Sequence, residues 1–226
     1  MQETSGVVCT HLWNFGGKDY ENNNSERQSQ KELEYGHAAE RSEKRGRIGR
    51  RGGFDLSYTG CRSCLACKRK GAERCKCFWK DDLSPVIDRI FAADALIIGS
   101  PIYLGDITSQ VRGLIERLHF CALSYDDYSN YFAGKVDVGI ILTMNAPKAF
   151  YKLAYGKKAK EVAQSFKALN GAVEVYASCD TLQVADYSKF DMASFSEEHK
   201  REVRKKQFPL DMEKAFEMGA RLSGGK

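Results

Sequence analysis

The sequence has no apolar run long enough to cross a bilayer. The longest, residues 92–105, is interrupted by Asp94 and is shorter than the roughly 20 residues that a spanning helix needs. The chain also lacks the opening charged segment and apolar run of a secretory signal. We therefore expect a cytoplasmic protein without membrane association. In that reducing compartment its eight cysteines are expected to be free thiols or metal and cluster ligands rather than structural disulfides.

Apolar residues are almost absent from residues 18–53. This segment contains no run that predicts a buried strand and no turn that could cradle a phosphate. Within it, residues 41–51 carry six basic side chains and one acidic side chain, which equals the net charge of +5 of the whole chain. Taken literally, residues 1–53 are a disordered, arginine-rich arm that could bind nucleic acid or another anionic partner.

From residue 54 onward, strand patterns and helical patterns alternate. The apolar runs ALIIGS, residues 95–100, and VDVGIILT, residues 136–143, are typical of strands buried on both faces of a parallel sheet. Helical patterns lie between the strands, and Gly171 is predicted to end the helix before a further strand, AVEVYAS. This alternation predicts an α/β protein with an open, doubly wound parallel sheet.

Four cysteines lie close together in CRSCLACKRKGAERC. They are Cys61, Cys64, Cys67 and Cys75. Two consecutive two-residue gaps suit thiolates that wrap around a [4Fe–4S] cluster, although the last gap is seven residues long. Free thiols are one alternative, and a tetrahedral zinc site at Cys64, Cys67, Cys75 and Cys77 is another. The histidines share no ligand spacing with these cysteines, and His119 is expected to be structural or solvent-facing.

The loop SPIYLGDITSQ, residues 100–110, follows the first of the apolar strands. Ligands of such sheets bind at the carboxyl ends of the strands. Pro101 cannot donate to a strand ladder, Tyr103 offers an aromatic face, and Gly105 allows close approach of the backbone. A planar cofactor with a polar edge would suit this loop; the alternative is a tight turn that binds nothing.

The run FDLSYTGCRSCLACK, together with DDLSPVIDRIFAADALIIGSPIYLGDITSQVRGLIERL, resembles the flavodoxin-like NADPH-dependent FMN reductases, in particular their iron-sulfur flavoproteins. The resemblance covers about residues 54–182. It implies that residues 54–226 form a flavodoxin-like domain with a cysteine-rich insertion at residues 61–77 and a helical C-terminus. It also implies dimers or tetramers with flavin sites near the subunit interfaces.

The resemblance implies an FMN-dependent oxidoreductase that passes electrons between a reduced donor, a [4Fe–4S] cluster and FMN. The donor would be NADH, NADPH or a ferredoxin-like protein, and no side-chain acid or base is required. The implied flavin contacts are Ser100, Pro101, Ile102, Tyr103, Gly105, Thr143 and Asn145, and the implied cluster ligands are Cys61, Cys64, Cys67 and Cys75. Two alternatives stay open: a cluster-free NAD(P)H-dependent FMN or quinone reductase, and a non-enzymatic protein that binds zinc or, less favoured, nucleic acid.

The family also requires a first strand and a phosphate loop before Phe54, where this sequence departs from the pattern. Reading the codons one base later permits KIMKIIIVNGSPRKN from Lys18 onward and MLLKEAKKGAESAGAEV up to Gly53. These stretches have the patterns of a strand, a phosphate loop and an amphipathic helix. Gly16 and Gly17 can be encoded as GGAGG, a ribosome-binding sequence. We therefore hypothesise that residues 1–53 are a wrong-frame translation and that the authentic first strand and phosphate loop are missing.

Overall fold

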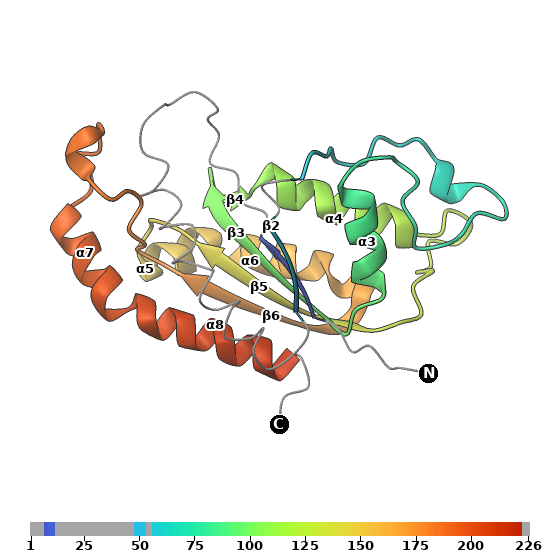
Figure 1. Cartoon of the computed structure of the whole chain (residues 1–226). Helices are drawn as coiled ribbons and strands as arrows, with labels where there is room; N and C mark the ends of the chain where they lie inside the picture. The colour runs from blue at the N-terminus through green and yellow to red at the C-terminus, as the bar shows by residue number, and fades with distance from the viewer. Residues whose placement is uncertain (1–6, 12–47, 53–55, 223–226) are drawn as a thin grey trace.

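The computed structural model describes residues 7–11, 48–52 and 56–222, and its centre is a sheet of parallel strands in the order β2-β1-β3-β5-β6 (Figure 1). The strands are β1 Val7–His11, β2 Ile48–Gly52, β3 Ala95–Tyr103, β5 Val136–Thr143 and β6 Asn170–Ser178. The short strand β4, Asp106–Ile107, pairs antiparallel with the end of β3. Without β4 the order is 2-1-3-4-5, which is that of flavodoxin-like doubly wound folds. The predicted fold class is confirmed.

Helices connect the strands and cover both faces of the sheet. The longer ones are α3 Leu83–Phe91, α4 Ser109–Ala122, α6 Gly156–Ser165, α7 Glu197–Lys206 and α8 Phe208–Leu222. Shorter helical turns are η3 Ala66–Lys68, α5 Lys148–Phe150, the π-helix η4 Tyr151–Tyr155, η5 Lys167–Leu169 and η6 Tyr187–Lys189. Among the residues that the structure describes, no helix combines the length and the apolar character that a bilayer crossing requires.

Alternate residues of the central strands point into two separate cores, as the pleat of a strand requires. Leu96 and Ile98 of β3 pack with α3, α4 and α6 in a core of 23 buried residues, whose side of the sheet we call the α4 face. Ala95 and Ile97 pack with α8 in a core of five buried residues, whose side we call the α8 face. In Figure 1, α8 runs along the front of the sheet, opposite α6.

The prediction that no strand precedes Phe54 is wrong for the residues that the structure describes. Strand β1, VVCTH, lies in parallel between β2 and β3, with Val7 opposite Ala95 and His11 opposite Gly99. Three of its five residues are β-branched, a short strand signal that the search downstream of Lys18 missed. The strand IGRRG of β2 carries almost no such signal, so its place follows from pairing with β1. The predicted absence of a phosphate loop concerns residues 12–47, which lie outside the described residues.

Gly171 does not end a helix, contrary to the sequence prediction. Asn170 takes the left-handed conformation there, with φ 60°, and Gly171 lies in β6. A Cβ atom on Gly171 would lie 2.0 Å from the carbonyl oxygen of Val136 in β5. The glycine is therefore needed for close approach of two strands, at an irregularity in their pairing between Val136 and Val138.

Candidate functional site

The chain after β3 turns back in a two-residue hairpin. Leu104 and Gly105 both have positive φ, 49° and 83°, as a type I′ turn requires, and Tyr103 pairs with Asp106 beyond it. Leu104 is fully exposed, and Tyr103 is 41% exposed. A bulky residue in the left-handed region is uncommon, and such backbone strain concentrates at binding sites. The hairpin therefore holds two apolar side chains at the carboxyl end of the central strand.

Ser100 stabilises the base of this hairpin. Its hydroxyl donates to the carbonyl oxygen of Pro101 at 2.8 Å and accepts from the backbone N–H of Thr108 at 3.0 Å. The side chain of Thr108 in turn accepts from the backbone N–H of Val111 and caps α4. Pro101 is buried and Ile102 is half-buried. Of the predicted flavin contacts in this loop, Tyr103 and the backbone at Gly105 are thus the accessible ones.

The loop after β5 is tied to the loop after β6. Thr143 is buried opposite Pro101 in the paired strands, which places the two predicted flavin loops side by side. The N–H of Met144 donates to Ser178 O at 3.1 Å, and the N–H of Asp180 donates to the carbonyl oxygen of Ala146 at 2.8 Å. The two loops therefore form one hydrogen-bonded unit beside the hairpin.

Asn145 carries a buried polar atom that nothing satisfies within the described part of the chain. Its Oδ1 has no hydrogen-bond partner there, while its Nδ2 donates to Gln183 Oε1 at 2.6 Å. A buried acceptor left without a donor costs about 1–3 kcal/mol. A ligand that donates a hydrogen bond at this point would recover that energy, so Asn145 fits the polar edge of a planar cofactor.

Lys200 of α7 stabilises the loop after β5, which contains Asn145. It is buried, donates to the backbone oxygen of Asn145 at 2.6 Å, and forms an ion pair with Asp180. Burial alone would raise the pKa of Asp180, but the hydrogen bonds from Lys200 and His199 outweigh it and lower that pKa below its usual value. Sequence reasoning missed Lys200, because nothing in a charged helix marks one lysine as buried.

The hairpin and the second loop meet through aromatic side chains. A Cβ atom on Gly105 would lie 3.4 Å from Tyr155 Cε1, so the π-helix η4 packs directly over the turn. The rings of Phe150 and Tyr155 are T-shaped, with centroids 5.4 Å apart. The turn after β3 and the π-helix η4 therefore lie in contact through aromatic side chains.

The cysteine segment lies at the other end of α4. Lys68 donates to the carbonyl oxygens of Phe120 and Leu123 at the C-terminus of this helix. The backbone N–H of Cys61 donates to Glu116 Oε2 at 3.2 Å. Helix α4 has 14 residues and is therefore about 20 Å long. The hairpin precedes the N-terminus of α4, whereas the cysteine segment contacts the C-terminal half of this helix (Figure 1).

Five thiols line an open cavity beside the C-terminal half of α4. The cavity holds about 350 Å³ of space free of atoms, part of it open to solvent. The thiols are those of Cys61, Cys64, Cys67, Cys77 and Cys121. Cys75, the predicted fourth ligand, is absent from the lining, whereas Cys77 and Cys121 were not among the predicted cluster ligands. Cys77 and Cys121 join the other thiols because of the way the cysteine segment packs on α4. The spacing of the cysteines in the sequence does not predict this packing.

The cysteines that line this cavity are the type of residue that binds an iron–sulfur cluster. Thiolates are the ligands that iron–sulfur clusters take, and four of the five belong to one short segment. Within the described ranges, no three His, Cys, Asp or Glu side chains are arranged to hold a single metal ion. A tetrahedral zinc site would bring its sulfurs to within about 4 Å of one another.

A buried arginine faces these thiols. Arg117 of α4 is 2% exposed, forms an ion pair with Asp81, and donates from Nη2 to Cys77 Sγ at 3.1 Å and to Ser84 Oγ at 2.6 Å. A hydrogen bond from Cys121, followed by those from the backbone and from Arg117, outweighs burial and lowers the pKa of Cys77 to about 5. The pKa of Cys121 is raised, because its thiol donates to the Cys77 thiolate. The cavity therefore already stabilises a thiolate.

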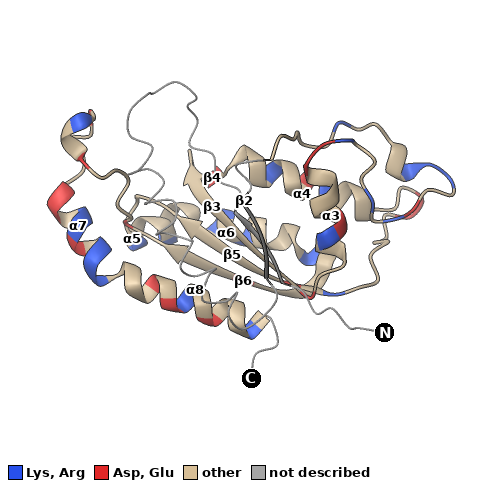
Figure 2. Cartoon of the chain, viewed as in Figure 1, with Lys and Arg blue, Asp and Glu red and all other residues tan. Residues whose placement is uncertain are grey.

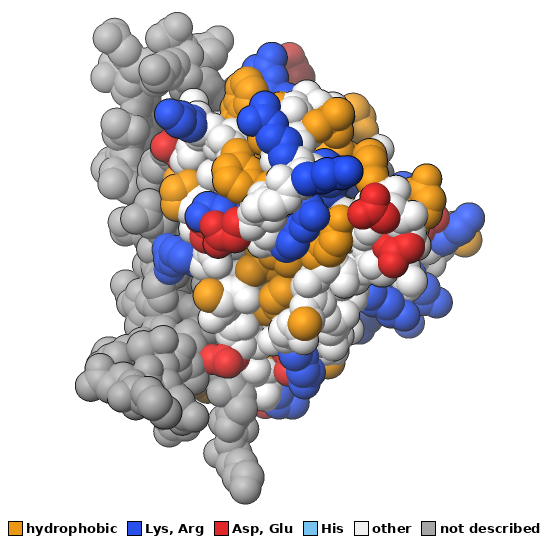
Figure 3. Space-filling view, turned by 90° about the vertical axis from the view of Figure 1, so that its right-hand side faces the viewer, with side chains coloured by type: hydrophobic (Ala, Val, Ile, Leu, Met, Phe, Trp, Pro, Cys, Tyr) orange, Lys and Arg blue, Asp and Glu red, His pale blue; other side chains and the backbone are white. Residues whose placement is uncertain are grey.

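The surface around the cysteines is basic. Residues 61–80 contain seven lysines and arginines but one acidic residue, Glu73, so this segment has a net charge of +6. Figure 2 shows these basic residues along the segment beside α3 and α4, and Figure 3 shows basic side chains among hydrophobic ones on this end of the molecule. Residues 61–80 are thus a second basic segment of the sequence, in addition to residues 41–51. Acidic residues elsewhere in the chain balance the charge of residues 61–80.

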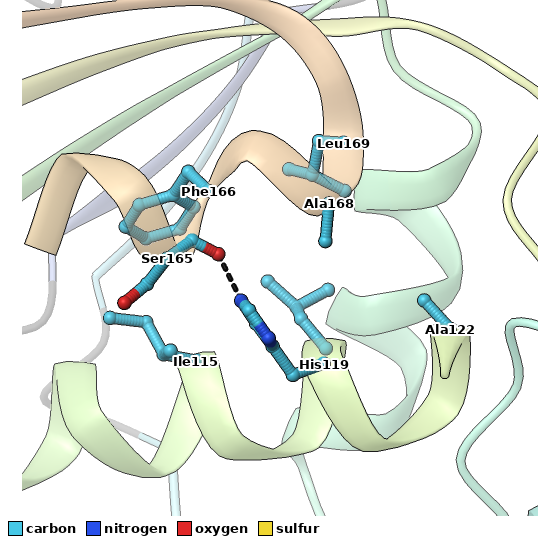
Figure 4. Close-up of a pocket in the computed structure, with 8 residues that line it drawn as sticks. Ile115, His119, Ala122, Ser165, Phe166, Ala168 and Leu169 are labelled. Carbon is cyan, nitrogen blue, oxygen red and sulfur yellow. Dashed lines mark hydrogen bonds between the residues drawn. The ribbon is translucent and has the colours of Figure 1, made fainter. Parts of the chain in front are cut away.

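His119 has a structural place, in line with the sequence prediction. Its Nε2 is hydrogen-bonded to the carbonyl oxygen of Ser165, across a small apolar pocket between α4 and the end of α6 (Figure 4). Ile115, Phe166 and Leu169 complete this pocket. The pocket belongs to the packing of two helices, and the hydroxyl of Ser165, which also lines it, donates to the carbonyl oxygen of Glu161.

The strand order, the hairpin at the carboxyl end of β3 and the neighbouring loops define a flavodoxin-like α/β protein. Residues 43–149 match the model of the NADPH-dependent FMN reductase family. It is similar to the iron-sulfur flavoprotein of Archaeoglobus fulgidus, with 32% identity over 87 residues, which are 38% of this chain and 41% of the relative. An iron-sulfur flavoprotein of Methanocaldococcus jannaschii is 31% identical over 85 residues, 38% of this chain and 42% of the relative. The chain thus spans about two fifths of the length of these relatives.

Solved structures share the fold at low sequence identity. The azoreductase from Bacillus anthracis has a TM-score of 0.56 and 11% identity, with 94% of this chain and 99% of that chain covered. The NAD(P)H:quinone oxidoreductase from Methanothermobacter marburgensis has a TM-score of 0.53 and 12% identity, with 97% and 100% covered. At such identity the likeness establishes the fold alone.

Proposed function

We propose that the protein is an FMN-dependent oxidoreductase of the iron-sulfur flavoprotein type, which passes electrons between a reduced donor, a [4Fe–4S] cluster and FMN. The observation that carries the proposal is that residues 43–149, the segment that matches the family, contain both the hairpin after β3 and most of the segment that lines the thiol cavity. The donor would be NADH, NADPH or a ferredoxin-like protein.

The flavin would bind at the carboxyl ends of the strands, where the strand order reverses between β1 and β3. FMN, when bound, accepts electrons singly or as a hydride. Tyr103 and Leu104 offer apolar surface to its ring, and Ser100 keeps the turn that carries them in place. Asn145 supplies an acceptor for its polar edge. None of these residues transfers a proton in this proposal.

The cluster would bind in the thiol cavity. Arg117 beside it would offset negative charge on thiolates and cluster. The net charge of +6 over residues 61–80 would attract an acidic donor protein such as a ferredoxin, and salt would weaken that attraction. The proposal also includes a homodimer or homotetramer, in which exposed apolar residues such as Leu104 and Leu153 would be covered.

A cluster-free NAD(P)H-dependent FMN or quinone reductase is the second candidate. It is favoured by the lack of a set of ligands arranged for a metal in the described part of the chain. In such a protein the cysteines would be free thiols, and the family match and the hairpin would be explained equally well.

Anaerobic purification of the full chain, followed by a visible spectrum and assays of FMN, iron and acid-labile sulfide, tests both candidates. The iron-sulfur flavoprotein is expected to show the flavin bands on a broad cluster absorption, with about four irons per chain. Flavin without iron, together with oxidation of NAD(P)H, would favour the second candidate. Colourless protein that binds zinc, or nucleic acid in a strongly salt-dependent manner, would contradict both.

A further inference from the structure

We propose that Lys200 of α7 is a positioning residue for the flavin site. Its buried ion pair with Asp180 holds Asn145 where the side-chain oxygen can accept a hydrogen bond from the polar edge of the flavin ring. This inference rests on the proposed function, because its ligand is the ring of the proposed FMN. Lys200 and Asp180 lie outside residues 43–149, so the match to the family model assigns them no role.

Contacts from the C-terminal part of the chain fix Asn145 at two points. Its backbone oxygen accepts from Lys200 Nζ at 2.6 Å, and its Nδ2 donates to Gln183 Oε1 at 2.6 Å. The residue before it is also tied to the loop after β6, because the N–H of Thr181 donates to the carbonyl oxygen of Met144 at 3.1 Å. Within the described part of the chain, Oδ1 is therefore the atom of this amide that is left for a ligand.

Helix α7 also holds the partner of the amide nitrogen. The N–H of Gln183 donates to the hydroxyl of Tyr187 at 3.1 Å, and the N–H of Tyr187 donates to Glu197 Oε2 at 3.3 Å. Glu197 is the first residue of α7. The helix thus reaches Asn145 by two routes, directly through Lys200 and indirectly through residues 183–187.

The burial of the ion pair favours a positioning role. The side chain of Lys200 is 5% exposed and that of Asp180 is 18% exposed. Burying two charges is costly, and replacing such a pair by apolar residues of similar volume often leaves stability unchanged or raises it. The ammonium group has three donors, and Lys200 directs two of them at fixed acceptors, the carboxylate of Asp180 and the backbone oxygen of Asn145. The pair is therefore better suited to fixing the position of a loop than to stabilising the fold.

The orientation of the amide determines which chemical edge the loop can recognise. The polar end of a flavin ring carries one N–H group between two carbonyl oxygens. Oδ1 of Asn145 can accept from that N–H but cannot pair with a carbonyl oxygen. A site built around such an acceptor discriminates against a ligand that lacks the donor. Loss of the contact from Lys200 should therefore reduce this discrimination.

A pair of ligands tests the acceptor in the full chain. Riboflavin has the ring N–H, whereas 3-methylriboflavin has a methyl group in its place. Neither has a phosphate, so the comparison does not depend on a phosphate loop. Dissociation constants are measured by the change in flavin fluorescence. The wild type is expected to bind riboflavin about tenfold more tightly than 3-methylriboflavin, because the analogue leaves Oδ1 buried without a donor.

The double variant Lys200→Met, Asp180→Asn tests the positioning role. It leaves no buried charge unpaired, and asparagine tolerates the left-handed backbone at position 180, where φ is 59°. We expect the ratio of the two dissociation constants to fall below about twofold in this variant. The matched control, Lys206→Met, changes a lysine of the same helix that is 76% exposed and should keep the ratio of the wild type.

The outcomes separate the inference from the proposed function. A double variant with the ratio of the wild type would overturn the inference and leave the proposed function standing. The same holds for a wild type that binds both ligands equally well. A wild type that binds neither ligand would overturn the inference together with the flavin part of the proposed function.

Hydrogen exchange of the protein without ligand provides a second measurement. Exchange of the backbone amides of residues 144–146 is compared with that of β5 in the wild type, the double variant and Lys206→Met. The double variant is expected to exchange about tenfold faster at residues 144–146 and unchanged in β5, because the loop opens locally without unfolding of the sheet. Equal exchange in all three proteins would refute the inference. Faster exchange throughout β5 would also refute it, because Lys200 would then stabilise the whole fold rather than position the loop.

Discussion

The two faces of the sheet are held in different ways. On the α4 face, three helices bury 23 residues in one apolar core. On the α8 face, one described helix buries five residues, and polar contacts supplement them. Asp211 of α8 accepts hydrogen bonds from the hydroxyls of Tyr176 and Ser178, and Arg221 forms an ion pair with Glu174. Because hydrophobic stabilisation scales with buried apolar area, the α4 face carries most of the stability of the described structure, and polar contacts fix the position of α8.

Chain topology explains why most of the described helices between strands lie on the α4 face. With right-handed crossovers, connections that move in opposite directions along a sheet lie on opposite faces. Helices α3, α4 and α6 all precede a move towards β6 and share the α4 face. The connection from β1 to β2 moves the other way and lies outside the described residues; a helix in a connection of that direction would lie on the α8 face. The shifted reading frame predicts an amphipathic helix at that point of the chain.

The largest effect is expected from the reading frame. Sequencing of the gene is expected to reveal a shift upstream of residue 54. Protein from the restored frame is expected to bind about one FMN per chain with a raised Tm, because the shifted frame encodes a phosphate loop and an amphipathic helix. FMN release assays and thermal unfolding of both proteins measure this. A gene in which no shift yields the strand and loop would rule the hypothesis out.

Removal of a buried charge on the α4 face should lower the free energy of unfolding more than removal of an exposed one. Arg117→Met leaves Asp81 without its buried partner and is expected to lower the free energy of unfolding by about 3–5 kcal/mol. Arg112→Ala, on the same helix, removes a pair with Asp106 whose side chains are 39% and 38% exposed, and should cost about 0–1 kcal/mol. Urea unfolding compares the two variants. Similar losses in both would show that the burial of Arg117 is not decisive.

Truncation of apolar side chains tests the comparison of the faces directly. Leu114→Ala on the α4 face should cost about 3–4 kcal/mol, because the dense core around this buried residue cannot collapse. Met218→Ala on the α8 face should cost about 2 kcal/mol, because its small core has fewer neighbours to lose. Chemical denaturation of both variants provides the values. An equal or larger loss for Met218→Ala would break the comparison.

The smallest expected effect is a pH dependence at the loop that α7 holds. The pKa of Asp180 is lowered in the folded protein by Lys200 and His199, although burial opposes this. Asp180 therefore stabilises the fold above its unfolded pKa of about 3.9, and this contribution is lost as the pH falls through the lower folded value. Urea midpoints between about pH 6 and pH 3 should fall more steeply for wild type than for Asp180→Asn. Parallel curves would show that Asp180 contributes nothing.

Much of the fold could be predicted because its signals are local. The run VDVGIILT became β5, and the C-terminal part of the chain is helical as predicted, in α7 and α8. A loop at residues 100–110 was also predicted, since Pro101, Tyr103 and Gly105 mark it, but the antiparallel pairing of β4 with β3 was not. The five-residue strand β1 was missed because so short a run gives little signal of its own.

The candidate cluster site could be predicted only in part. Spacing points to Cys61, Cys64 and Cys67, which do share a cavity. It does not point to Arg117 and Cys121, which reach that cavity from α4 more than 40 residues further along the chain. Contacts over such separations depend on the packing of helix against loop, and local pattern does not encode them.

The sequence by itself determined the alternation of strands and helices, the loop that follows β3 and the cysteine-rich segment, because each depends on residues that are neighbours in the chain. Only the tertiary structure decided which thiols face one cavity, that Arg117 and Lys200 are buried, and that the two faces of the sheet differ in depth. These features arise when segments that are distant in the sequence pack together and exclude water. The free energy of this burial depends on all the packed segments, so no single segment predicts it.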